Sequence, residues 1–227
     1  MIPFSMLRIA LIPGYATELA TKGFRSARAT DAGFTAFRTL INQAHAVTFR
    51  WGIPRTLSFF ATLALMPILT LYRNEEQHAI TERTMSNLKT FLTTHQPEVI
   101  VAHSLGARLL MEYCHRHTLP ASVKRVVLCQ ADMPTVTPPL HHHVEILHVY
   151  CPWDPSLILS SILHSDVRAG LRKMAGVRNI LIPLWRPINF HTSSIRDARL
   201  VDLALETLGN EAPRAPLRSA RGFLAAR

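Results

Sequence analysis

The chain has 227 residues, which is enough for one domain with a full buried core but too few for two such domains. Hydrophobic residues make up 48% of it and charged residues 18%, so the composition excludes an intrinsically disordered chain. The formal net charge of +10 favours acidic partners such as an anionic membrane surface. No helix-turn-helix, zinc-finger or aromatic-plus-basic signature accompanies this charge, and we therefore expect no nucleic-acid partner.

The cysteines and the start of the chain indicate a reducing compartment. Cys114, Cys129 and Cys151 are odd in number and lie in apolar runs, which predicts small buried thiols and no disulfide framework. The first apolar stretch lacks a basic region before it and is interrupted by Arg8, so it does not predict a secretory signal. The expected location is the cytoplasm, with peripheral association at a membrane as a further option.

Apolar runs and segments of helical period alternate through the chain. In chain order we expect strand 7–12, helix 30–42, strand 46–50, helix 81–93, strand 99–103, helix 105–115, strand 125–130, strand 146–150, helix 155–174, strand 180–184 and helix 195–208. Most of these strands are continuously apolar, as strands covered on both faces are. The pattern predicts an α/β fold with a parallel, doubly wound sheet.

Two segments depart from this alternation. Residues 56–72 are almost wholly apolar and contain Pro67, and their length is at or below the roughly 17–25 residues that span a bilayer. A buried helix, a hydrophobic lid beside a substrate pocket and a membrane-dipping segment are the three interpretations. Residues 209–227 are rich in Pro, Ala and Arg, which predicts a flexible basic tail after a domain of residues 1–208.

The strongest chemical signal is the run VIVAHSLGAR at residues 99–108. An apolar strand leads directly into Ser104 and a helix follows at once, with the small residues Ala102 and Gly106 two positions to either side. A sharp strand-to-helix turn needs small residues there, and the helix N-terminus directs partial positive charge towards a developing oxyanion. The alternative is a serine that only caps a helix. His103 is expected to be a packed, hydrogen-bonded histidine.

This run resembles the nucleophile elbow of the α/β-hydrolases, G-x-S-x-G, with Ala102 in place of the first glycine. In that family the chain order is Ser, then an acid, then His. Asp154 follows strand 146–150 and His191 follows strand 180–184, so both lie beyond carboxyl ends of parallel strands, where loops converge. The resemblance thus implies Ser104 as nucleophile, Asp154 as orienting acid and His191 as general base.

Alternatives remain for the acid and the base. Asp132 lies just past strand 125–130 and could replace Asp154, since some lipases carry the acid one strand earlier. His164 falls within an expected helix, so we interpret it as a packing or surface residue.

The resemblance also implies an oxyanion hole. The backbone N–H of Leu105, directly after the nucleophile, would supply one donor. Tyr15, after the Pro13–Gly14 turn that follows the first strand, would supply the other, although a simple Pro-Gly turn explains the same residues. His141, His142 and His143 have no companion ligands in the sequence, so we expect a solvated loop and no metal site.

The resemblance covers residues 7–208 and implies a minimal α/β-hydrolase fold, an about six-stranded, mostly parallel sheet with helices on both faces. It further implies hydrolysis of a carboxylic ester through an acyl-enzyme without metal or organic cofactor. The expected substrate is a small-molecule acyl ester or a lipid. An acyltransferase, a thioesterase or a non-catalytic binding protein on the same fold are the alternatives.

Overall fold

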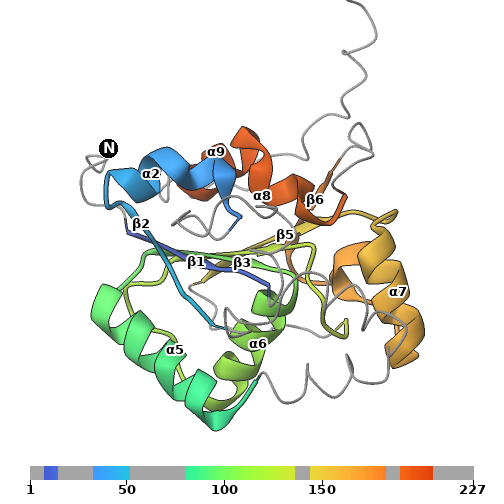
Figure 1. Ribbon diagram of the computed structural model, residues 1–227, viewed down its shortest axis with the longest axis horizontal. Helices are drawn as coiled ribbons and strands as arrows, with labels where there is room; N and C mark the ends of the chain where they lie inside the picture. The colour runs from blue at the N-terminus through green and yellow to red at the C-terminus, as the bar shows by residue number, and fades with distance from the viewer. Residues whose placement is uncertain (1–7, 15–32, 52–79, 136–143, 183–189, 207–227) are drawn as a thin grey trace, which may run out of the picture.

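The strands form one parallel sheet at the centre of the molecule (Figure 1). The computed structural model describes residues 8–14, 33–51, 80–135, 144–182 and 190–206. Within these ranges six strands pair in the order β2-β1-β3-β4-β5-β6, and every pair is parallel. The strands are β1 (Ile9–Ile12), β2 (Ala46–Thr48), β3 (Val99–His103), β4 (Arg125–Cys129), β5 (Glu145–Tyr150) and β6 (Arg178–Leu181).

Helices cover both faces of the sheet. In Figure 1, α5 (Glu82–His95) and α6 (Leu105–Arg116) lie on the lower face, and α2 (Arg38–Asn42), α8 (Ser193–Arg196) and α9 (Ala198–Leu205) lie on the upper one. Every residue of β1, β3 and β4 is buried, because both sides of these strands face a core cluster. The structure therefore confirms the predicted fold class, and the strand order is that of an α/β-hydrolase sheet without its first two strands.

The expected helix 155–174 was wrong in its length. Helix α7 (Pro155–His164) ends at Ser165, which adopts a left-handed conformation (φ 56°) as the C-cap. The chain then reaches a short 3₁₀ turn, η4 (Ala169–Leu171), after the buried Arg168. Arg168 extends inward and pairs with Asp132 at 3.1 Å.

Other expected elements also differ at their bounds. The 3₁₀ turn η3 (Thr35–Phe37) precedes α2 where we expected one helix, and the last helix is divided at Asp197, whose carboxylate accepts a hydrogen bond from the N–H of Arg199 at the start of α9. A side chain that caps a helix in this way also ends the preceding one. A further 3₁₀ turn, η5 (Phe190–Thr192), precedes α8.

Several sequence predictions fall outside the described residues. They are the hydrophobic segment 56–72, the basic tail 209–227, Tyr15 and the histidines at 141–143. None of the helices in the described part of the chain has the length and apolar character that crossing a bilayer requires.

The three cysteines are free thiols. Burial raises the pKa of Cys114 to about 12, and it also raises the pKa of Cys129 and of Cys151. Because the thiolate is the reactive form, these side chains act as small apolar groups in the packing.

Gly106 lies tightly against the end of β1 and the residue that follows it. A Cβ atom at this position would lie 2.5 Å from the carbonyl oxygens of both Ile12 and Pro13. Both obstacles are backbone, so a flexible side chain cannot make room. Only glycine lets α6 begin against the loop that follows β1.

We expect Gly106→Ala to lower the free energy of unfolding by about 1–3 kcal/mol, since the added methyl group forces two backbone segments apart. Urea denaturation followed by circular dichroism measures this. Asn87→Ala, on the exposed side of α5, is the control and should change stability by less than about 0.5 kcal/mol. Equal stability of Gly106→Ala and the parent would contradict the packing argument.

Candidate active site

Ser104 occupies a strained turn between β3 and α6. Its backbone has φ 54° and ψ −127°, an unfavourable conformation for a residue with a side chain. The small neighbours Ala102 and Gly106 permit the turn, and Ser104 keeps 8% of its surface exposed. Leu105, the first residue of α6, follows it directly. This is the local geometry that presents a serine hydroxyl at the edge of a sheet.

His191 and Asp154 form a hydrogen-bonded chain with Ser104. His191 Nε2 lies 2.7 Å from Ser104 Oγ, and His191 Nδ1 lies 2.8 Å from Asp154 Oδ2. The carboxylate can only accept, so Nδ1 carries a proton and Nε2 accepts the serine hydroxyl. The three side chains come from the ends of β3 and β5 and from the segment beyond β6, which parallel strands bring to one edge.

Four donors hold the Asp154 carboxylate, which is fully buried. Oδ1 accepts the backbone N–H groups of Ser156 (3.0 Å) and Leu157 (3.3 Å) at the start of α7. Oδ2 accepts His191 Nδ1 and, at 2.7 Å, Gln130 Nε2. Burial alone would raise the pKa of Asp154, but the His191, Leu157 and Gln130 donors outweigh it and lower the pKa. Asp154 is therefore ionised at neutral pH.

The pKa of His191 is raised above its ordinary value. Burial acts against the charged ring, but the hydrogen bond and the charge of Asp154 outweigh it, and Asp132 adds a smaller contribution. The side chain is still 25% exposed, so a substrate or a water molecule can approach it. An imidazole with these properties can take up and return a proton near neutral pH.

His103 supports the backbone of the base. Its Nε2 lies 2.6 Å from the carbonyl oxygen of His191 and must donate, because a carbonyl only accepts. Burial, with the nearby His191 ring, lowers the pKa of His103 to about 3, so this side chain is neutral.

Gln130 is a positioning residue that sequence analysis missed. It follows β4, is fully buried and has a left-handed backbone (φ 45°). Its amide donates to Asp154, while its Oε1 accepts the Ser194 hydroxyl at 2.7 Å, three residues after His191. Gln130 thus ties the acid to the helix beside the base. Its location at the carboxyl end of a strand was the available signal.

Asp132, the alternative acid, has other partners. Its carboxylate accepts the Ser160 hydroxyl at 2.7 Å and pairs with Arg168 Nε at 3.1 Å. Its backbone N–H donates to the carbonyl oxygen of Ser104 at 3.2 Å. The His191 ring donates its Nδ1 hydrogen bond to Asp154 instead. His164, the other histidine considered, is the last residue of α7.

The loop after β1 is held close to the nucleophile. Pro13 accepts a hydrogen bond from the indole of Trp51 at 2.8 Å, in addition to its contact with Gly106. Tyr15, two residues later, lies outside the described residues, so its predicted role as an oxyanion donor stays a prediction. Among the described residues no group of three or more His, Cys, Asp or Glu side chains could hold a metal ion.

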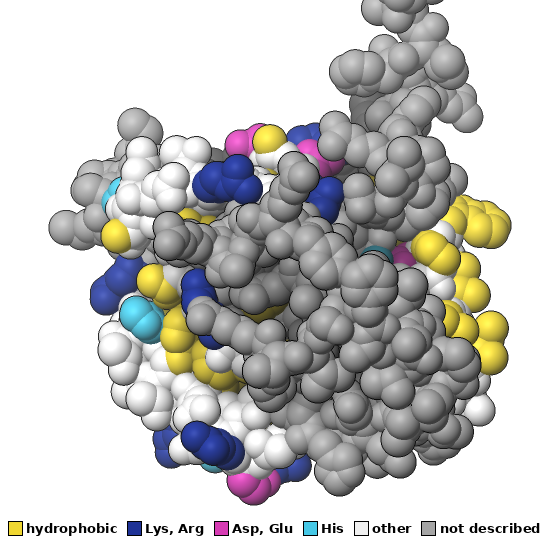
Figure 2. Space-filling model, viewed as in Figure 1, with side chains coloured by type: hydrophobic (Ala, Val, Ile, Leu, Met, Phe, Trp, Pro, Cys, Tyr) yellow, Lys and Arg dark blue, Asp and Glu magenta, His cyan; other side chains and the backbone are white. Residues whose placement is uncertain are grey.

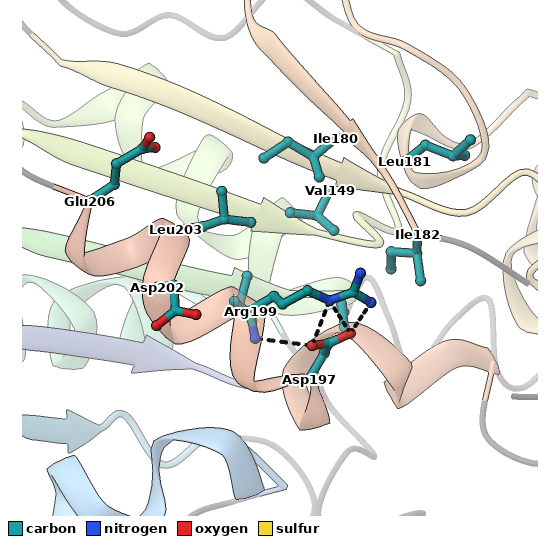
Figure 3. Close-up of a pocket in the computed structure, with 11 residues that line it drawn as sticks. Val149, Ile180, Leu181, Ile182, Asp197, Arg199, Asp202, Leu203 and Glu206 are labelled. Carbon is teal, nitrogen blue, oxygen red and sulfur yellow. Dashed lines mark hydrogen bonds and ion pairs between the residues drawn. The ribbon is translucent and has the colours of Figure 1, made fainter. Parts of the chain in front are cut away.

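A separate cavity of about 350 Å³ lies between β5, β6 and α9. Figure 3 shows Val149, Ile180 and Leu203 against it, with the ion pair of Asp197 and Arg199 across its rim. None of the three side chains of the Ser–His–Asp chain lines this cavity. It is therefore distinct from the candidate active site.

The parallel sheet, its strand order and the serine elbow define an α/β-hydrolase fold. No protein-family model and no curated protein matches the sequence. One similar solved structure is a proposed hydrolase of the alpha/beta superfamily from Xanthomonas campestris pv. campestris. It has 14% identity and a TM-score of 0.43, with 88% of this chain and 98% of that chain covered.

A second similar structure is a predicted CIB-like hydrolase from Thermoplasma acidophilum. It has 13% identity and a TM-score of 0.45, with 91% of this chain and 90% of that chain covered. Similarity this distant carries no information about chemistry.

We expect Asp154→Asn to lower the pKa of His191 below its ordinary value, because burial remains while the carboxylate charge that opposes it is lost. An NMR titration of the imidazole, assigned with a His191→Gln variant, measures this pKa. Asp132→Asn is the matched control and should lower the pKa less. A larger decrease for Asp132→Asn than for Asp154→Asn would reverse the roles of the two acids.

Proposed function

We propose that the chain is a serine hydrolase that cleaves carboxylic esters through an acyl-enzyme. The observation that carries this proposal is the continuous hydrogen-bonded chain from Ser104 through His191 to Asp154, which starts at a strained strand-to-helix turn. A serine hydroxyl, an imidazole that accepts its hydrogen bond and a buried ionised carboxylate, linked in this order, are the components of nucleophilic acyl transfer. The proposed substrate is a small-molecule acyl ester or a lipid.

In the proposed reaction Ser104 Oγ attacks the ester carbonyl while its proton moves to His191 Nε2. The oxyanion accepts hydrogen bonds from the N–H of Leu105 and, by the resemblance, from that of Tyr15. Collapse breaks the ester bond, and the alcohol leaves with the proton from His191. Water then attacks the acyl group while His191 takes a proton from the water. The carboxylic acid leaves Ser104, and His191 returns the proton to Ser104 Oγ.

Asp154 enables His191 both to accept a proton and to return it. Its charge stabilises the imidazolium that forms in each half-reaction, and its hydrogen bond keeps Nε2 directed at Ser104. The helix N-terminus of α6 directs its N–H groups to the same place where negative charge develops. No step of this proposal draws on a cofactor.

We expect Ser104→Ala to lower kcat on a short p-nitrophenyl ester by about 10⁴-fold or more, with the far-ultraviolet circular dichroism unchanged. The parent should also react with a fluorophosphonate probe, with the adduct at Ser104. Ser86→Ala, at an exposed position of α5, is the control and should keep full activity and labelling. Turnover or labelling that persists in Ser104→Ala would refute the serine-hydrolase proposal.

The value of kcat/KM should rise with pH through the raised pKa of His191, because only the neutral imidazole accepts the serine proton. We expect Gln130→Met to lower kcat about tenfold with KM unchanged, since the lost hydrogen bond joined a charged group. It should also move the rise in kcat/KM to higher pH. With one donor fewer, the Asp154 carboxylate becomes more basic and holds the His191 proton more strongly.

Ser194→Ala is the matched control for Gln130, because it removes a partner of the Gln130 oxygen and leaves the donor to Asp154 in place. Its pH profile should coincide with that of the parent. A Gln130→Met variant that loses only thermal stability, with kcat and the pH profile unmoved, would assign Gln130 a purely structural role.

A further inference from the structure

Helix α7 presents an apolar outer face beside the candidate active site. Five of the six large hydrophobic side chains that are exposed in the described part of the chain belong to this helix or its flanks, and the sixth is Leu181 on β6. We call them the α7 face: Trp153, Ile158, Leu159, Ile162 and Val167. Trp153 is 64% exposed and Ile162 is 70% exposed, which is unusual for such side chains.

Helix α7 buries Leu157 and Ser160 on its inner side. Ser160 donates to the Asp132 carboxylate and accepts from Arg168 Nε, so it serves the buried Asp132–Arg168 ion pair. Ser161 donates to the Leu157 carbonyl oxygen of its own helix and accepts the backbone N–H of Arg168. The ion pair needs polar partners because a buried charge is costly without them. With Leu157 and Ser160 directed inward, the side chains at positions 158, 159 and 162 lie on the outer side of the helix and are exposed. Figures 1 and 2 show α7 at the side of the molecule, with hydrophobic side chains along its outer surface.

Positive charge lies at the C-terminal end of this face. Arg172 donates to the Thr135 hydroxyl at 3.0 Å, and the same hydroxyl donates to the carbonyl oxygen of Val167. Arg172 and Lys173 are both exposed. The helix itself contains no Asp, Glu, Lys or Arg, and the whole chain has a net charge of +10.

We propose that the α7 face docks on an anionic lipid surface. An apolar helix face with a tryptophan at one end, and with Arg172 and Lys173 beyond the Asp166–Arg168 ion pair at the other, matches the interfacial region of a bilayer. There apolar side chains insert and cations meet phosphate groups. Asp154 caps α7, so the face adjoins the candidate active site. This inference rests on the proposed ester hydrolysis. Because the α7 face adjoins the candidate active site, it assigns membrane-embedded acyl esters as the substrate class.

The test is binding to vesicles of equimolar phosphatidylcholine and phosphatidylglycerol, measured by flotation without substrate. We expect Ile158→Ser/Ile162→Ser to weaken binding by about tenfold or more, because two apolar side chains no longer insert. Leu181→Ser, the matched control, removes an exposed side chain of comparable type on β6 and should change binding by less than about twofold. Equal binding of the double variant and the parent, or no binding of the parent, overturns the proposal.

Charge is tested separately. Vesicles of pure phosphatidylcholine should bind the parent more weakly, and Arg172→Gln/Lys173→Gln should lose this preference for anionic lipid. Sedimentation velocity without vesicles tests whether a second copy of the chain, and not lipid, covers the α7 face. A parent dimer that Ile158→Ser/Ile162→Ser converts to a monomer would assign the α7 face to self-association and overturn the lipid proposal.

Activity measurements distinguish the two proposals. The Ile158→Ser/Ile162→Ser variant should hydrolyse a soluble short-chain ester like the parent but lose activity on an ester embedded in anionic vesicles. Ser104→Ala should bind vesicles like the parent. If vesicle binding depends on α7 but no ester is cleaved, the proposed function fails alone, and if esters are cleaved without vesicle binding, only the lipid proposal fails.

Discussion

The candidate site depends on the way in which one buried charge is satisfied. The Asp154 carboxylate has no access to solvent, and such a group is stable as an ion only when donors surround it. Its four donors come from the first turn of α7, from Gln130 after β4 and from His191 beyond β6. One carboxylate thereby fixes the start of a helix, the end of a strand and the ring of the histidine relative to one another.

Close backbone contacts give this arrangement its rigidity. Gly106 brings α6 against the loop after β1, where any Cβ would meet carbonyl oxygens at 2.5 Å. Gly170 plays the same part next to Gln130, because a Cβ there would lie 2.5 Å from the Gln130 carbonyl carbon and 2.7 Å from the Ala131 nitrogen. Both glycines sit where the chain passes the carboxyl edge of the sheet. The site is thus built on backbone segments that have little freedom to move apart.

Asp132, the second acidic residue at this edge of the sheet, is not part of the Ser–His–Asp chain. It influences the surface of the protein. Asp132 is paired with Arg168, whose side chain is 1% exposed, and this ion pair holds Ser160 of α7 inward through hydrogen bonds to both partners. The outward direction of Ile158 and Ile162 follows from that internal requirement. A need for polar partners inside the protein therefore determines the apolar character of its outer face next to the candidate site.

The sequence by itself determined the alternation of strands and helices, the turn at Ser104, His191 as the candidate base, and Asp154 or Asp132 as the candidate acid. These features are readable because periodicity, small residues at a turn and position after a strand are local properties. Only the tertiary structure decided that Asp154 contacts His191 while Asp132 pairs with Arg168, and that Gln130 joins the acid to Ser194. It also decided which side α7 exposes, because Asp132, which holds Ser160 inward, lies far away in the chain.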